Sequence, residues 1–254
     1  MTVKLWKSLP GAAFAVIGAA LFWVAFDGGS YSVSSRTSLA IVVLWIILLC
    51  VLLRVVQTAG LETLPRVIAV SLGAFAIWTL ASAMWSSSTE RAFIEFDRVA
   101  LYLGVFLLGS WVGTRDAALR LRNALAFAVI AVLVVGLVSR FFPHLFSTRG
   151  LPEFLPGSAT RLSFPLDYWN GLGIFLALGL PIWLEVALDT RLPYLARNAV
   201  VAVLPALSVA LYLTSSRGAV ATAAAGLLAF IAISRERWAP LSALTAGIVG
   251  SLST

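Results

Sequence analysis

The chain alternates long apolar runs with short polar connections along almost its whole length. Nine runs of 16 to 23 uncharged residues leave all 18 basic and 11 acidic residues between them. A helix rises about 1.5 Å per residue and a bilayer core is about 30 Å thick, so each run is close to one membrane span. The pattern predicts spans near 9–26, 38–56, 67–86, 98–114, 123–140, 168–187, 198–215, 218–234 and 239–254.

Composition supports an all-α, polytopic transmembrane helical bundle of about nine spans, forming a single membrane domain over residues 1–254. Hydrophobic residues make up 61% of the chain and charged residues 11%, whereas a soluble domain carries about 25% charged residues. The runs are continuously apolar, which argues against the alternating strands of an outer-membrane barrel.

Charge gives the expected orientation. The net charge is +7, but the basic residues are spread singly along the connections, which does not favour nucleic-acid binding. Eleven of the 18 lie in the connections on the side of the N-terminus, so we expect that side to be cytoplasmic. The connection 140–167 and the turn at Arg217 then face outward.

Three connections are predicted to have local structure. Ser87 and Glu90 have capping-box spacing, which predicts a short interfacial helix before the fourth span. The connection 140–167 holds four prolines among apolar residues and is predicted to be a structured outer loop. Residues 198–234 would measure roughly 55 Å as one helix. The chain must therefore turn near Arg217, and Gly218 can supply the backbone freedom.

Arg217 is the first candidate for chemistry. It lies between two long uncharged runs, where an arginine is costly unless it reaches the interface or finds an anion. Its planar guanidinium suits bidentate binding of phosphate. An arginine that merely ends a helix at the headgroups is the alternative.

A second group of candidates lies in the segment RLSFPLDYWNGLG, residues 161–173, at the mouth of the sixth span. It brings together Arg161, Asp167, Tyr168 and Asn170, with Trp169 as an interfacial anchor. Asp167 is either a general base or the salt partner of Arg161, and the second role is favoured because edge carboxylates are common.

Arg98 borders the fourth span and is the candidate that could extend a basic pocket, although spacing also predicts that Glu95 and Arg98 pair on a helix surface. A single histidine, His144, and a single cysteine exclude a metal cluster built on several of these residues. Phosphate-cradling and zinc-protease motifs are absent from the sequence. We therefore expect activity without a metal or other cofactor.

Two segments resemble the bacterial O-antigen ligase and polymerase family. The segment LYLTSSRGA, residues 211–219, is similar to the Ser-Arg-Gly turn of that family, and the segment that starts at Arg161 is similar to the one that precedes its next span. The resemblance implies a glycosyltransferase that moves a glycan from an undecaprenyl-pyrophosphate carrier to an acceptor hydroxyl, at the outer face of the bacterial inner membrane. It also implies that Arg161 and Arg217 hold the pyrophosphate.

The candidate site thus comprises Asp167 as the candidate base and, for substrate binding, Arg161, Arg217, Ser216, Asn170, Tyr168 and Arg98. Family members continue with further spans and a large outer loop bearing a histidine. The resemblance therefore covers their N-terminal membrane portion, and we expect activity if the protein continues beyond residue 254. The alternatives are an O-antigen-type polymerase and a non-catalytic transporter or flippase-like membrane protein.

Overall fold

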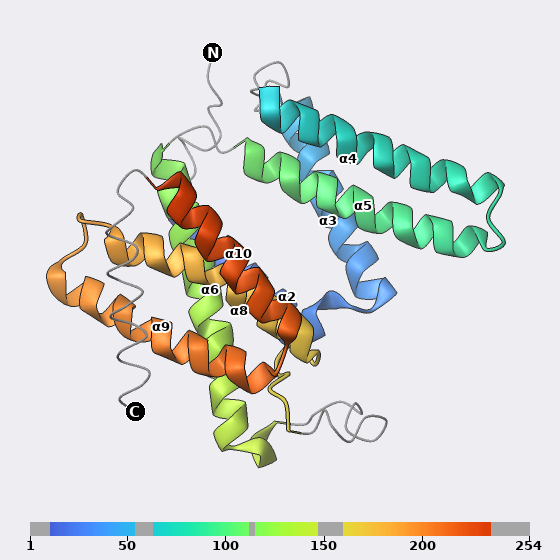
Figure 1. Ribbon diagram of the computed structural model, residues 1–254. Helices are drawn as coiled ribbons and strands as arrows, with labels where there is room; N and C mark the ends of the chain where they lie inside the picture. The colour runs from blue at the N-terminus through green and yellow to red at the C-terminus, as the bar shows by residue number, and fades with distance from the viewer. Residues whose placement is uncertain (1–10, 54–62, 112–114, 147–159, 235–254) are drawn as a thin grey trace. The chain divides into compact units, whose positions relative to one another are not determined.

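The computed structural model describes residues 11–53, 63–111, 115–146 and 160–234 (Figure 1). In this part of the chain it is all-α, as predicted, with eight α-helices and no strand. The α-helices are α2 (Gly11–Phe26), α3 (Val33–Leu52), α4 (Thr63–Ala81), α5 (Thr89–Ser110), α6 (Arg115–Phe141), α8 (Trp169–Leu188), α9 (Tyr194–Thr214) and α10 (Arg217–Ile233). Short 3-10 helices lie at η1 (Gly28–Ser30), η3 (Ser82–Met84) and η4 (Pro143–Leu145).

The chain divides into two compact units. Unit 1 comprises Met1–Ala13 and Ser30–Arg120, and unit 2 comprises Phe14–Gly29 and Leu121–Thr254. In unit 1, α5 packs against both α3 and α4 (Figure 1). Ala40, Val43 and Leu101 form its small buried core.

Helix α8 is the centre of unit 2, where it packs against α9 and α10. Leu172, Leu176, Leu180 and Leu184 recur at every fourth position and are all buried. This spacing places them on one face of the helix. The burial of that stripe fixes both ends of α8 relative to its neighbours.

Two glycines allow α8 to approach its neighbours closely. A Cβ atom at Gly173 would lie 2.6 Å from the Cβ of Ala219 in α10, and one at Gly179 would lie 2.5 Å from Cγ1 of Val129 in α6. Both distances are far shorter than a van der Waals contact. Small residues at such points are typical of helices packed in membranes.

Several apolar helices indicate a membrane protein. Four are long and apolar enough to cross a bilayer: Val33–Leu52, Thr63–Met84, Arg115–Phe141 and Trp169–Leu188. In the second of these, 6% of the most apolar window is buried inside the structure, so most of that surface requires lipid or protein to cover it.

The predicted count of about nine spans is not confirmed. Three further apolar helices, Ala13–Phe26, Val200–Thr214 and Arg217–Ile233, are shorter than a typical span. Residues 98–110 of the predicted span 98–114 lie in α5, whose first half also carries Glu95, Asp97 and Arg98, and residues 112–114 lie outside the described residues. The predicted span 239–254 lies outside the described residues.

The predicted start of the fourth span was wrong in its details. A separate interfacial helix capped by Ser87 was expected, but α5 is one continuous helix whose cap is Ser88. The hydroxyl of Ser88 accepts a hydrogen bond from the backbone N–H of Arg91 at 3.4 Å. Neighbouring serines offer alternative caps, and the sequence spacing alone does not choose between them.

The turn before Arg217 exists, but Gly218 does not supply its backbone freedom. Ser215 adopts the left-handed conformation, with φ 51° and ψ 32°, and ends α9. Gly218 is the second residue of α10. A single residue in this conformation is enough to end one helix and redirect the chain into the next.

We expect Gly173→Ala to destabilise the fold, because its new methyl group meets a Cβ that cannot rotate away. Overpacking of this kind costs about 1–3 kcal/mol, which lowers Tm by a few degrees in a chain of this size. Thermal unfolding of the purified protein in detergent measures the effect. Gly109→Ala is the matched control, since nothing lies within 4 Å of a Cβ built there. Equal Tm values for the two variants would contradict the close packing of α8 on α10.

Candidate functional site

The segment that carries Arg161 is fixed against the end of α9. The backbone N–H of Leu162 donates a hydrogen bond to the carbonyl oxygen of Leu213 at 2.9 Å. Leu162, Pro165 and Leu166 are buried, which anchors the irregular residues that lead into α8. The same segment borders α6, because a Cβ at Gly136 would lie 3.1 Å from the carbonyl oxygen of Phe164.

The turn that precedes Arg217 lies beside the same end of α8. A Cβ at Gly173 would be 3.0 Å from Oγ1 of Thr214 and 3.3 Å from Cβ of Ser216. The hydroxyl of Ser216 accepts a hydrogen bond from the N–H of Ala219 at 3.2 Å and so caps α10. Ser216 is 3% exposed, so the structure gives it a capping role, and its role in substrate binding stays a prediction.

The two predicted arginines therefore belong to segments that meet at one end of unit 2. Arg217 is the first residue of α10 and is exposed. Arg161 is partly buried, and its guanidinium carbon lies 5.1 Å from the ring centroid of Trp169. The ion pairs found among the described residues include neither arginine. The favoured pairing of Arg161 with Asp167 is thus not among them.

Asp167, Tyr168 and Asn170 surround the start of α8. Asp167 has a left-handed backbone, with φ 55°, and its Oδ2 would lie 3.7 Å from a Cβ built at Gly28. Asn170 donates a side-chain hydrogen bond to the hydroxyl of Tyr168 at 3.0 Å. The role of Asp167 as a general base stays a prediction.

Arg98 belongs to the other unit. It lies in α5 of unit 1 and pairs with Glu95 one helical turn before it, as the sequence spacing predicted. Asp97 accepts a hydrogen bond from the hydroxyl of Thr37 in α3 at 2.9 Å. The first contact lies within the charged half of α5, and the second links that half to α3.

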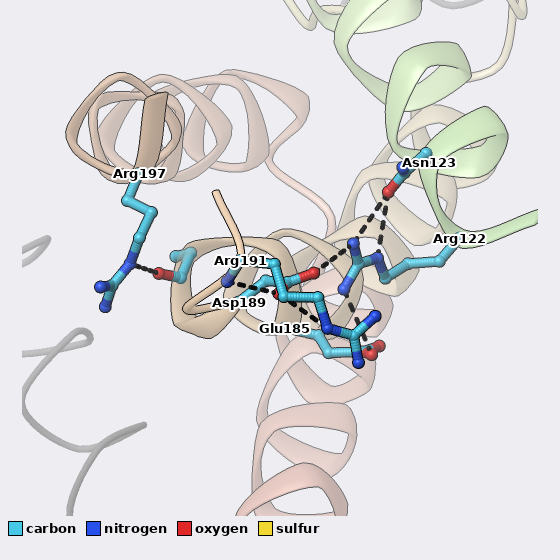
Figure 2. Close-up of polar contacts among 7 residues, drawn as sticks. Arg122, Asn123, Glu185, Asp189, Arg191 and Arg197 are labelled. Carbon is cyan, nitrogen blue, oxygen red and sulfur yellow. Dashed lines mark hydrogen bonds and ion pairs between the residues drawn. The ribbon is translucent and has the colours of Figure 1, made fainter. Parts of the chain in front are cut away.

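A second polar cluster lies at the opposite end of α8, and sequence reasoning did not identify it. Arg122 projects from α6 and forms ion pairs with Asp189 at 2.9 Å and with Glu185 at 3.5 Å (Figure 2). The Arg122 side chain is 9% exposed and that of Asp189 is 12% exposed. Arg122 also donates two hydrogen bonds to the side-chain oxygen of Asn123.

Two more arginines border this ion-pair cluster (Figure 2). The backbone N–H of Arg191 donates to Oδ1 of Asp189 at 3.1 Å, and the side chain of Arg197 donates to the carbonyl oxygen of Ala187 at 3.1 Å. Burial by itself would raise the pKa of the Asp189 carboxyl. The hydrogen bonds from Arg122 and Arg191 and the charges of both arginines outweigh burial, so the pKa is lowered.

The two ends of α8 therefore have different chemical capacities. At one end, Arg122 of α6 forms an ion pair with Asp189, which directly follows α8, and this pair suits a structural link between the two helices. The end with Arg161 and Arg217 presents guanidinium groups outside any ion pair found in the described part of the chain. Within residues 11–53, 63–111, 115–146 and 160–234, no group of three or more His, Cys, Asp or Glu side chains could hold a metal ion.

Comparisons with protein-family models, with curated proteins and with solved structures find no match. The resemblance to the O-antigen ligase and polymerase family therefore rests on the two sequence segments at 161–173 and 211–219.

We expect Asp189→Asn to destabilise unit 2 strongly, because it leaves the buried Arg122 guanidinium without its closest carboxylate. Removal of one partner of a buried pair costs roughly 3 kcal/mol or more. Glu185→Gln is the control, since that side chain is 53% exposed and its contact is longer, and an exposed pair contributes at most about 1 kcal/mol. Thermal unfolding at pH 7 compares the two, and a larger loss for the control would contradict the assignment.

The same carboxylate predicts a pH dependence. Because the pKa of Asp189 is lower in the folded protein than in the unfolded chain, its ionised form stabilises the fold at pH above the ordinary carboxyl value of about 3.9. This stabilisation is lost as the pH falls through the lowered folded pKa. We expect the Tm difference between the wild type and Asp189→Asn to be large at pH 7 and to shrink steadily below about pH 4. A difference that stays constant down to pH 3 would show that Asp189 is not the titrating group.

Proposed function

We propose that this chain is a metal-independent glycosyltransferase of the O-antigen ligase type, embedded in a membrane. It would move a glycan from an undecaprenyl-pyrophosphate carrier to an acceptor hydroxyl. The observation that supports this most directly is the hydrogen bond between Leu162 and Leu213. It joins the segment of Arg161 to the end of the helix that leads into Arg217.

The chemistry of this end of unit 2 fits an anionic lipid head. Two guanidinium groups provide bidentate donors for phosphate oxygens, and Arg217 opens a helix of 17 residues whose N-terminus favours negative charge. The apolar surfaces of the surrounding helices suit the polyprenyl tail. On departure of the pyrophosphate, the same groups would stabilise the charge that develops on it.

The acceptor hydroxyl needs a base, and Asp167 is our candidate in this chain. It directly precedes Tyr168 and Trp169 at the start of α8, on the segment that also carries Arg161. A general base has to come within hydrogen-bond reach of the hydroxyl proton, about 2.6–3.2 Å. Tyr168 and Asn170 are candidate contacts to the sugar, because their polar groups lie at the same helix start.

We place the protein in the bacterial inner membrane as a multi-pass protein with a cytoplasmic N-terminus. The excess of arginines and lysines on that side supports the orientation. It puts the Arg161 and Arg217 end of α8 at the outer face and the Arg122 ion-pair cluster at the cytoplasmic face. In this proposal α2, α5, α9 and α10 also cross the bilayer.

The proposal predicts that Arg161→Ala and Arg217→Ala each weaken binding of undecaprenyl pyrophosphate. A hydrogen bond to a charged group is worth about 1.5–3 kcal/mol, so we expect a loss of roughly tenfold or more in affinity. The measurement is a binding titration with the full chain in lipid nanodiscs.

Arg191→Ala is the matched control for this titration. Arg191 is also an exposed arginine, with a side chain 51% exposed, but it lies at the opposite end of α8. We expect its affinity to equal that of the wild type. Wild-type affinity in both Arg161→Ala and Arg217→Ala, or an equal loss in Arg191→Ala, would reject the proposed site.

A further inference from the structure

Trp169 supports the guanidinium of Arg161 in a way that the sequence did not suggest. The guanidinium carbon lies over the indole ring, 5.1 Å from its centroid. This is within the distance of about 6 Å at which a cation is attracted to an aromatic face, and indole is the strongest of the aromatic partners. The sequence had indicated that Trp169 serves as an interfacial anchor.

The start of α8, which carries the indole ring, is fixed by packing, and the ring has an aromatic neighbour. Trp169 is the first residue of α8, and the helix is fixed a turn later by Leu172, which is fully buried, and by the close contact at Gly173. The ring of Tyr168 is a close neighbour of the indole, with centroids 5.5 Å apart and planes tilted by 53°. The hydroxyl of Tyr168 accepts the hydrogen bond from Asn170. Arg161 therefore rests on a supported aromatic surface.

This support differs from that of the arginines paired with carboxylates. Glu95 holds Arg98, and Asp189 holds Arg122. A carboxylate occupies the N–H donors of a guanidinium and neutralises its charge. An aromatic face attracts the cation through its quadrupole, so the charge and the N–H groups at the edge of the guanidinium remain for another anion.

We propose that Trp169 is a positioning residue for the donor pyrophosphate, acting through Arg161; this inference rests on the proposed function. By restricting the guanidinium before the ligand arrives, the ring reduces the conformational entropy that Arg161 loses on binding. Trp169 itself does not contact the phosphate. Its contribution therefore exists only while Arg161 is present.

Trp169→Leu tests the inference, with Trp169→Phe as the conservative variant. Loss of a cation–π contact corresponds to about a three- to thirty-fold change in an equilibrium constant. We expect Trp169→Leu to weaken binding of undecaprenyl pyrophosphate by that factor and Trp169→Phe to retain most of the affinity. Trp23→Leu is the control, because it makes the same replacement at an exposed tryptophan of α2 in the same unit. If the leucine variant does not fold, Trp169→Met replaces it as a bulky side chain without a ring.

A double-mutant cycle separates positioning from a merely structural role. In the Arg161→Ala background, replacement of Trp169 by leucine should cause no further loss of affinity. An equal loss in both backgrounds, or no loss in either, would overturn the inference while the proposed function stands. If the wild type does not bind undecaprenyl pyrophosphate, or Arg161→Ala binds as well as it does, the proposed function fails and the inference fails with it.

Discussion

The approach of α8 to the turn between α9 and α10 is the contact on which the candidate site depends. Because Gly173 has no side chain, Ala219, Thr214 and Ser216 approach it closely, and a Cβ there would lie only 2.6 Å from the Cβ of Ala219. The segment before α8 then reaches the end of α9, where Leu162 donates to Leu213. Without this approach, Arg161 and Arg217 would belong to unrelated connections. Helix packing, rather than a dedicated loop, brings the two segments together.

A second constraint is that charge near an apolar environment has to be compensated. In unit 2, the arginine charges at the two ends of α8 are compensated in different ways. Arg122, at 9% exposure, is matched by Asp189 and Glu185 and so links α6 to α8. Arg161 lies on the ring of Trp169, and Arg217 opens a helix at an exposed position. The charge of Arg122 is neutralised by carboxylates, whereas the charges of Arg161 and Arg217 lie outside the ion pairs found in the described residues.

Hydrophobic pattern predicted the helices well because a continuous apolar run of this length has few other structures available. The predicted 168–187 and 218–234 closely match Trp169–Leu188 and Arg217–Ile233. The finer features depended on tertiary contacts that periodicity does not encode. The predicted span 123–140 excludes Arg122, but α6 starts at Arg115, and Arg122 on this helix pairs with carboxylates 63 and 67 residues away. The left-handed residue is Ser215 rather than Gly218, because the exact end of α9 decides which residue has to turn.

The nature of the partner determines what an arginine can do. Two opposite charges 4 Å apart attract by about 4 kcal/mol at an effective dielectric constant of 20, so a carboxylate on Arg161 would have to be displaced before a pyrophosphate could take its place. An indole face exerts a weaker attraction and does not compete for the N–H donors. The contact between Arg161 and Trp169 thus orders the arginine side chain without occupying its N–H donors. Under the proposed function, this combination favours exchange of a charged lipid head, because a saturated pair such as Arg122 and Asp189 would resist it.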